Sequence, residues 1–227
     1  MPSYKLKLWI DFCKRFRIGD LGVPLFNVTN RSVSILTIGR GPGRHVLQRS
    51  AAMDKLIVSE VQKVNDDHKK GLGRYDGLIY LMYKMRGDLV IPVYVGKALK
   101  HRQGTDDRLS ATLQAIERNQ DKFCRWGYGY AYHVGGLSAI VCPGHPDEKK
   151  AQKYVRWADR LFKNHPSKKP KLKAPVYFWI KAWKKGETGI WPDFGPTTLT
   201  FLESLLIGIA ADLFPHQLLN DGGLHPS

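Results

Sequence analysis

Hydrophobic, β-branched and aromatic residues fill two stretches of the chain, 75–83 and 89–97, with polar turn residues at 84–88 between them. Residues of these types favour half-buried strands. Glycine and aspartate in the short interval favour a turn. The pattern therefore predicts an antiparallel hairpin.

Tyrosines alternate with aliphatic residues in both predicted strands. Tyr80 stands between two aliphatic residues, and Tyr94 stands between two valines. Because successive side chains of a strand point to opposite faces, we expect both tyrosines to project from one face and the aliphatic residues from the other. Gly96 ends the second strand and would let another backbone or a ligand come close.

Apolar residues at helical spacing predict helices over residues 50–70, 105–119, 147–164 and 197–212. The second of these follows capping residues at 104–107 and carries Arg108 in its first turn, where a cation opposes the helix dipole. The last is strongly apolar but holds Glu203 in its middle turns, and such a carboxylate needs a cation, hydrogen-bond donors or an opening to water. The structural alternative for Glu203 is a capping box with Thr200 as the N-cap.

Strand-like patterns occur at residues 23–28, 32–38, 123–141 and 175–180. Glycine and aromatic residues alternate with period two after residue 123, which predicts a strand with one aromatic face, turned at 135–136. The segment 4–16 fits either a strand or a helix.

Two tripeptides of the hairpin, Leu78-Ile79-Tyr80 and Tyr94-Val95-Gly96, precede Lys97 and the helix that carries Arg108. In this order and spacing they resemble the GIY-YIG nuclease superfamily, most closely its free-standing restriction endonucleases. Leu78 departs from the glycine usual in the family. Thr112 departs from the histidine or tyrosine that often follows the arginine.

The resemblance implies an α/β (α+β) fold with a small, mainly antiparallel three-stranded sheet flanked by helices, with N-terminal and internal elaborations. Residues 75–121 and 174–222 would form the catalytic core, and the third strand would lie at 175–180. Residues 1–74 would be an N-terminal extension that binds DNA, 122–173 a basic and aromatic insertion, and 223–227 a tail.

The resemblance also implies a reaction, the hydrolysis of phosphodiester bonds. Glu203 would hold Mg²⁺ or Mn²⁺ against the scissile phosphate. Arg108 would stabilise the charge that gathers on the phosphoryl oxygens. Tyr80 or Tyr94 would orient or deprotonate the attacking water, although a free phenol titrates near pH 10, so a base needs a neighbouring cation.

Two further residues complete the expected site. Lys97 would lower a tyrosine pKa or contact phosphate directly. Asn220, which follows Pro215, matches a family asparagine at a longer interval from Glu203 than is usual.

Positive charge adds a partner to this picture, because 36 Lys and Arg residues outnumber 20 Asp and Glu in the 227 residues, for a net charge of +16. Such a charge favours a polyanionic partner, above all nucleic acid, and the alternative is a basic protein without such a partner. The resemblance to restriction endonucleases implies double-stranded DNA. A solvated face is the alternative for the densest part of this positive charge, which contains Lys149, Lys150, Lys153, Arg156, Lys168, Lys169 and Lys171. The glycine-rich loop 39–45, with Arg40 and Arg44, would contact phosphates or form a wide turn.

Other classes of protein fit the sequence less well. Three distant cysteines indicate neither a disulfide framework nor a zinc site. The N-terminus lacks an apolar signal core, and the longest apolar run, 205–211, is too short to span a bilayer. We therefore expect a cytoplasmic, metal-dependent DNA endonuclease of restriction type. Cutting both strands with one active site would favour a homodimer. The alternatives are an inactive basic nucleic-acid-binding protein on the same scaffold and a repair or mobile-element nuclease.

Overall fold

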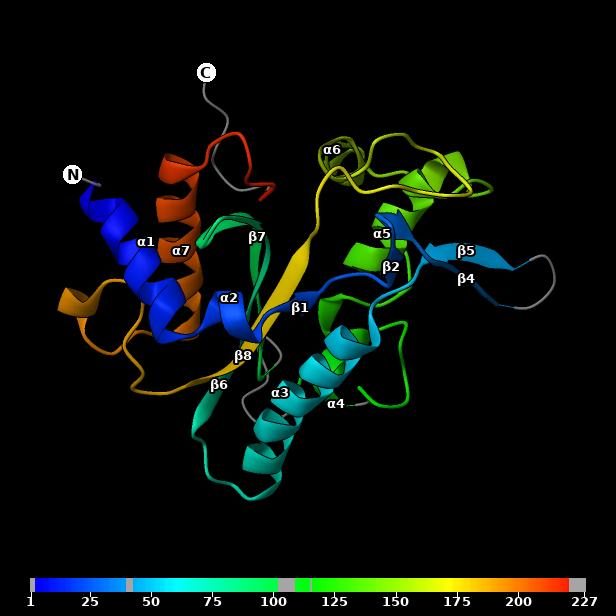
Figure 1. Ribbon diagram of the computed structural model, residues 1–227. Coiled ribbons are helices and arrows are strands. Elements are labelled where there is room, and N and C mark those ends of the chain that lie inside the picture. Colours follow the sequence, from blue (N-terminus) through cyan, green and yellow to red (C-terminus); the bar gives the residue numbers. More distant parts are fainter. Residues whose placement is uncertain (1–2, 40–42, 102–108, 115, 221–227) are drawn as a thin grey trace. The chain divides into compact units, whose positions relative to one another are not determined.

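The computed structural model of the chain describes residues 3–39, 43–101, 109–114 and 116–220. Its α-helices are α1 (Tyr4–Arg15), α2 (Ile18–Leu21), α3 (Ala51–Lys69), α4 (Ala111–Gln114), α5 (His133–Val141), α6 (Gln152–Leu161) and α7 (Leu199–Leu213). Short 3₁₀ helices are η1 (Phe123–Arg125), η2 (Asp147–Lys149) and η3 (Pro192–Phe194). The strands are β1 (Val23–Pro24), β2 (Val28–Thr29), β3 (Ser32–Val33), β4 (Ile35–Ile38), β5 (Arg44–Leu47), β6 (Tyr75–Arg86), β7 (Leu89–Leu99) and β8 (Tyr177–Lys184) (Figure 1).

Contacts divide the chain into two compact units. The sheet unit comprises Met1–Val23, Ser59–Gln114 and Tyr177–Ser227, and the second unit comprises Pro24–Val58 and Ala115–Val176. These boundaries differ from those expected, because α1 packs on the main sheet while the strands β2 to β5 belong with α5 and α6. The N-terminal residues therefore do not form one separate extension.

The predicted hairpin is confirmed in the sheet unit. β6 pairs antiparallel with β7, and β8 pairs antiparallel with the other side of β6. The sheet order is β1-β8-β6-β7, so the expected count of three strands was wrong by one. The additional strand, β1, has two residues, which is too short for any periodic signal in the sequence.

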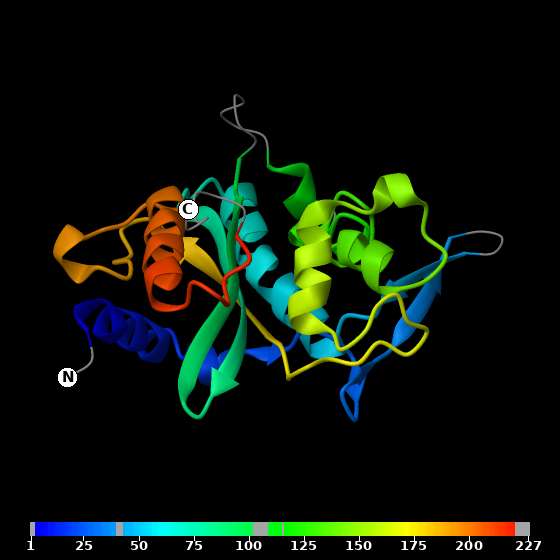
Figure 2. The ribbon, with the colours of Figure 1, turned by 90° about the horizontal axis from the view of Figure 1, so that it is seen from above.

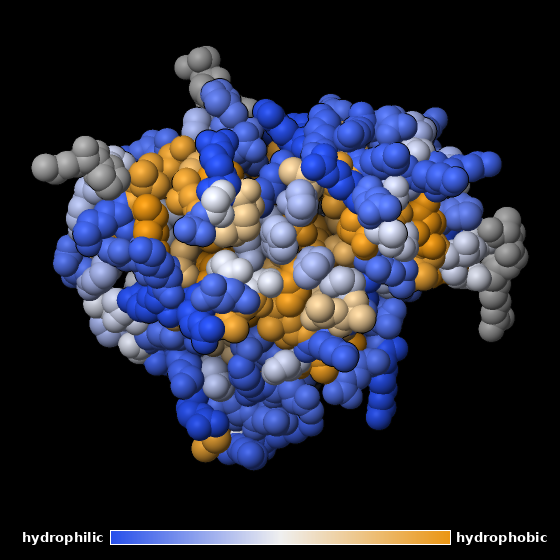
Figure 3. All heavy atoms as spheres, in the orientation of Figure 1, coloured by the Kyte–Doolittle hydropathy of each residue, from blue (hydrophilic) through white to orange (hydrophobic). Residues whose placement is uncertain are grey.

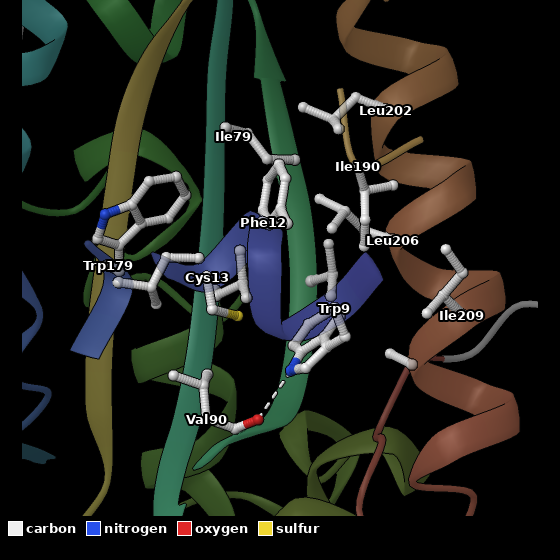
Figure 4. Packing of buried hydrophobic residues seen from close by; sticks show 14 of the residues in the cluster. Trp9, Phe12, Cys13, Ile79, Val90, Trp179, Ile190, Leu202, Leu206 and Ile209 are labelled. Carbon is white, nitrogen blue, oxygen red and sulfur yellow. Dashed lines mark hydrogen bonds between the residues drawn. The ribbon is translucent and has the colours of Figure 1, made fainter. Parts of the chain in front are cut away.

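Helices α1 and α7 cover one face of this sheet (Figure 2). Figure 4 shows Trp9 and Phe12 of α1 packed between the strands and the leucines of α7, with the Trp9 indole N–H donating to the carbonyl of Val90 at 2.9 Å. The ambiguous segment 4–16 is thus a helix. Its buried residues follow helical spacing, and the Ser3 side chain accepts from the Leu6 amide at its start.

The strand predicted over 123–141 was wrong. The structure places η1, an irregular segment and helix α5 there, and α5 is buried along its whole length, so it shows no polar face. The glycines permit tight backbone crossings: a Cβ at Gly127 would lie 2.2 Å from the Asp121 carbonyl oxygen, and one at Gly135 would lie 2.2 Å from that of Gly129. The period of two therefore reflects packing of a loop.

The helices predicted at 50–70 and 197–212 are confirmed as α3 and α7. The helix predicted at 105–119 is shorter in the described residues, where α4 spans four residues and turns follow at 116–118. The helix predicted at 147–164 begins later, at Gln152, because η2 precedes it.

Hydrophilic residues cover much of the molecular face drawn in Figure 3, and hydrophobic side chains show between them. Among the described helices, none combines the length and the apolar composition needed to cross a membrane.

Candidate functional site

The two tyrosines of the hairpin lie together, as predicted. The ring centroids of Tyr80 and Tyr94 are 6.4 Å apart and the rings are nearly parallel, at 27°. Tyr80 pairs across the strands with Gly96, and a Cβ at Gly96 would lie 2.6 Å from the Tyr80 ring. Glycine is therefore required here because the tyrosine ring lies against it. Tyr80 is buried, at 2% exposure, whereas Tyr94 is partly exposed.

Lys97 and Glu203 also meet, although 106 residues separate them. The Nζ of Lys97 on β7 hydrogen bonds to Oε2 of Glu203 on α7. Both side chains keep some solvent access, at 21% and 19% exposure. The Thr198 hydroxyl caps α7 by accepting from the Phe201 amide, so Glu203 lies beyond the first turn and the capping box with Thr200 is excluded.

The two pairs lie on opposite faces of the sheet. Lys97 pairs with Ile79, and Ile79 belongs to the core beneath α7. Tyr80 and Tyr94 alternate with these residues and point to the other face. The structure therefore does not bring the phenols and the Glu203 carboxylate together on one face, contrary to expectation. Arg108 lies outside the described residues.

Asn220 reaches the outer edge of β7. Its side chain accepts from the Val95 amide at 3.0 Å and donates to the Val95 carbonyl at 2.7 Å. The Leu219 amide donates to the Val93 carbonyl at 2.8 Å, so the C-terminal segment follows the same edge. Asn220 thus lies at the edge of β7 between the positions of Tyr94 and Lys97.

A buried ionic network lies at the base of the hairpin. The carboxylate of Asp67 accepts from Lys100 Nζ at 2.9 Å, from the Arg74 amide at 3.0 Å and from Arg74 Nε at 3.1 Å. Burial alone raises the pKa of this carboxyl, but the bonds from Lys100 and Arg74 outweigh it and lower the pKa from 3.8 to about 2. Sequence reasoning missed the network. The available signal was an acid that continues the apolar stripe of α3 beyond Val64.

The Lys97–Glu203 pair offers one carboxylate, that of Glu203, as a ligand for a divalent cation. Within the described ranges, no group of three or more His, Cys, Asp or Glu residues is arranged to hold a metal. Glu203 fits an ion only if water and phosphate oxygens of a substrate complete the shell, which is a common arrangement for Mg²⁺.

Apart from Asn220, the residues proposed to contact nucleic acid are basic and belong to the second unit. Among these residues Lys149, Lys150, Lys168, Lys169 and Lys171 are exposed, while Lys153 and Arg156 are partly buried. Three of the cations lie over aromatic rings. The guanidinium of Arg44 and the Nζ of Lys149 are 4.5 Å and 5.9 Å from the Tyr130 ring centroid, and Lys153 Nζ is 5.6 Å from that of Trp157. Arg40 lies outside the described residues.

Comparison with known proteins gives no match: no family model, no curated protein and no solved structure is similar to this chain.

Proposed function

We propose that this chain is a metal-dependent nuclease that hydrolyses phosphodiester bonds in double-stranded DNA. The observation that carries the proposal is the Lys97–Glu203 pair, which joins the second strand of the hairpin to α7 and keeps access to solvent. Glu203 is the acid that the resemblance to GIY-YIG nucleases assigns to the metal, and Lys97 directly follows the second tripeptide of that resemblance.

In this proposal the site extends around the outer edge of β7. Because β7 ends the sheet, side chains of both its faces can approach a phosphate that lies along this edge. Val93 and Val95 direct their peptide groups to Leu219 and Asn220 outside the sheet, and by the same alternation Lys97 directs its own peptide N–H to that edge. An amide and an ammonium from Lys97 would therefore both face an anion there.

Glu203 is the residue that would hold Mg²⁺ or Mn²⁺, which when bound stabilises charge on phosphoryl oxygens. Lys97 would neutralise a non-bridging oxygen of the same phosphate. Of the two phenols, Tyr94 has the solvent access needed to orient a water, and the buried Tyr80 ring supports it from beside Gly96. Arg108 remains a proposed partner of the phosphate.

The second unit would hold the DNA. Its exposed lysines suit contacts to a phosphate backbone, which are independent of sequence and weaken with salt. A restriction-type enzyme that cuts both strands with one such site would act as a homodimer.

One observation favours an alternative, a basic nucleic-acid-binding protein without catalysis. The phenols and the carboxylate lie on opposite faces of the sheet, and Lys97 already neutralises Glu203. In that case DNA would bind in the same way, and no cleavage would follow.

Cleavage of supercoiled plasmid in Mg²⁺, in Mn²⁺ and in EDTA distinguishes the two functions. We expect nicking or linearisation with either metal, no cleavage in EDTA, and no cleavage by Glu203→Gln although this variant still binds DNA. Asp212→Asn is the matched control, because Asp212 is an exposed acid of the same helix that pairs with Lys5. An inactive wild-type protein that binds DNA would overturn the nuclease in favour of the binding protein. Full activity of Glu203→Gln would remove Glu203 from the site.

A further inference from the structure

The second unit contains a solvent-open cavity of about 650 Å³ that plays no part in the site described above. Ile38, Gly39, Gly43 and Arg44 of the β4–β5 hairpin form one wall, the segment 117–121 forms another, and the buried Tyr128 lies at its border. A volume of this size is within the range of pockets that bind small organic groups, roughly 300–1,000 Å³.

The polar groups of the cavity are varied and balanced in charge. It is lined by two guanidinium groups, two carboxylates and two amides, from Arg44, Arg118, Glu117, Asp121, Asn119 and Gln120. Arg44 Nη2 lies 4.0 Å from Asp121 Oδ1, so part of the positive charge is compensated within the wall. In a chain of net charge +16, this balance makes the cavity a poor site for phosphate alone.

The wall that carries the amides has a fixed backbone. The Tyr128 amide donates to the Gln120 carbonyl at 3.2 Å, and the Lys122 amide donates to the Asn119 carbonyl at 3.0 Å. The side chains of Asn119 and Gln120 are thus presented from a backbone held in place on both sides, which reduces the entropy lost when they bind a ligand.

A buried cation packs against the Tyr128 ring at the border of the cavity. The guanidinium of Arg49, at 1% exposure, lies between two rings, 4.1 Å from the Tyr128 centroid and 4.2 Å from that of Phe123. Its Nε bonds to Asp54 at 2.7 Å, and its Nη1 donates to the Trp126 carbonyl at 2.8 Å. These bonds hold the Tyr128 ring in one orientation.

We propose that this cavity binds a nucleobase presented by an unpaired or extruded nucleotide of DNA, and this inference rests on the proposed DNA-binding function. Amides pair with adenine, guanidinium groups with guanine and carboxylates with the amino group of cytosine. A bidentate pair of this kind contributes about 1–3 kcal/mol to the choice of base. The cavity is therefore a specificity site in a unit whose exposed lysines contact the backbone.

The test compares fluorescein-labelled single-stranded oligonucleotides of one length, with and without bases, by anisotropy in EDTA. We expect the wild type to bind at least one base-containing homopolymer about tenfold more tightly than the abasic strand, the effect of one base held by a bidentate hydrogen-bonded pair. The double substitution Asn119→Ala/Gln120→Ala should remove that preference and leave abasic binding unchanged. The matched control, Gln152→Ala/Asn164→Ala, changes the same residue types at exposed positions of the second unit and should keep the preference.

Equal wild-type affinity for the abasic strand and all homopolymers would overturn the proposal, and so would a preference that survives Asn119→Ala/Gln120→Ala. Because no metal is present, the result is independent of cleavage. A protein that shows the base preference but leaves plasmid intact in Mg²⁺ would refute the nuclease and keep the cavity.

Discussion

Replacing Asp67 by asparagine tests whether a buried ion network holds the base of the hairpin. The carboxylate is inaccessible to solvent and accepts from Lys100, whose side chain is 5% exposed, and from Arg74. Asparagine keeps the size of the side chain but removes its charge. Lys100 would then be a buried ammonium without its counterion.

Two estimates set the magnitude. Breaking a buried ion pair by removing one partner costs about 3–5 kcal/mol, because an uncompensated charge stays buried. The pKa of Asp67 falls from 3.8 to about 2, and at about 1.4 kcal/mol per pKa unit this corresponds to roughly 2 kcal/mol of stabilisation by the ionised form. We therefore expect Asp67→Asn to lower the free energy of unfolding by about 2–4 kcal/mol at pH 7.

The same shift fixes the dependence on pH. The folded state binds the Asp67 proton less tightly than the unfolded chain does, so the stabilisation is complete well above pH 3.8. It is lost as the pH falls through 3.8 towards 2, where protonation favours unfolding. The stability difference between wild type and Asp67→Asn should therefore be constant from pH 7 to pH 5 and shrink below about pH 4.

Urea unfolding followed by circular dichroism at several pH values measures both effects. Asp66→Asn is the matched control, since Asp66 is the preceding residue of α3 and is exposed. We expect that control to change the stability by less than about 0.5 kcal/mol. A loss below about 1 kcal/mol for Asp67→Asn at pH 7, or a difference from wild type that grows as the pH falls, would refute the reasoning.

Three further substitutions have defined outcomes. Gly96→Ala should displace the Tyr80 ring and destabilise the chain by about 1–3 kcal/mol in thermal unfolding, and an unchanged melting temperature would contradict the contact between them. Asn220→Ala removes both hydrogen bonds to Val95, so hydrogen exchange at the Val95 amide should accelerate, and unchanged protection would show that the edge is held in another way. Arg49→Met should cost roughly 2 kcal/mol in urea unfolding, because the Trp126 carbonyl loses its buried donor, and no loss would mean that the aromatic contacts alone hold the loop.

The elements that could be predicted from the sequence are those whose periodic pattern is continuous. The hairpin, α3 and α7 each place at least six residues in one regular pattern, and the structure confirms all three. The third strand expected at 175–180 exists as β8, but it spans Tyr177–Lys184. Prediction failed where burial is complete or packing replaces periodicity. Helix α5 has no polar face to mark it, and the alternation of glycine and aromatic residues before it arises from backbone contacts with Asp121, which no local pattern encodes.

The candidate sites divide in the same way. The Lys97–Glu203 pair joins residues far apart in sequence, and only the resemblance to a nuclease family placed them in one site before the fold was known. The Asp67 network and the cavity beside Arg44 were not predicted, because each combines residues from segments whose approach depends on the tertiary fold.

The alternation of side chains along β7 restricts any mechanism proposed for this site. Tyr94 and Lys97 are three residues apart on one strand, so their side chains point to opposite faces of the sheet. Tyr80 pairs with Gly96 and shares the face of Tyr94, whereas Glu203 bonds to Lys97 on the other face. A reaction that used them all on the face of the sheet would need a bulge in β7 after Tyr94, where the register is continuous from Tyr94 to Leu99. A substrate that lies along the edge of β7 needs no such change, because it meets both faces and the Lys97 amide together. Asn220 occupies this edge through its two hydrogen bonds to Val95. Its release on DNA binding would indicate a substrate along the edge of β7, and its retention would indicate a substrate on the face of the sheet.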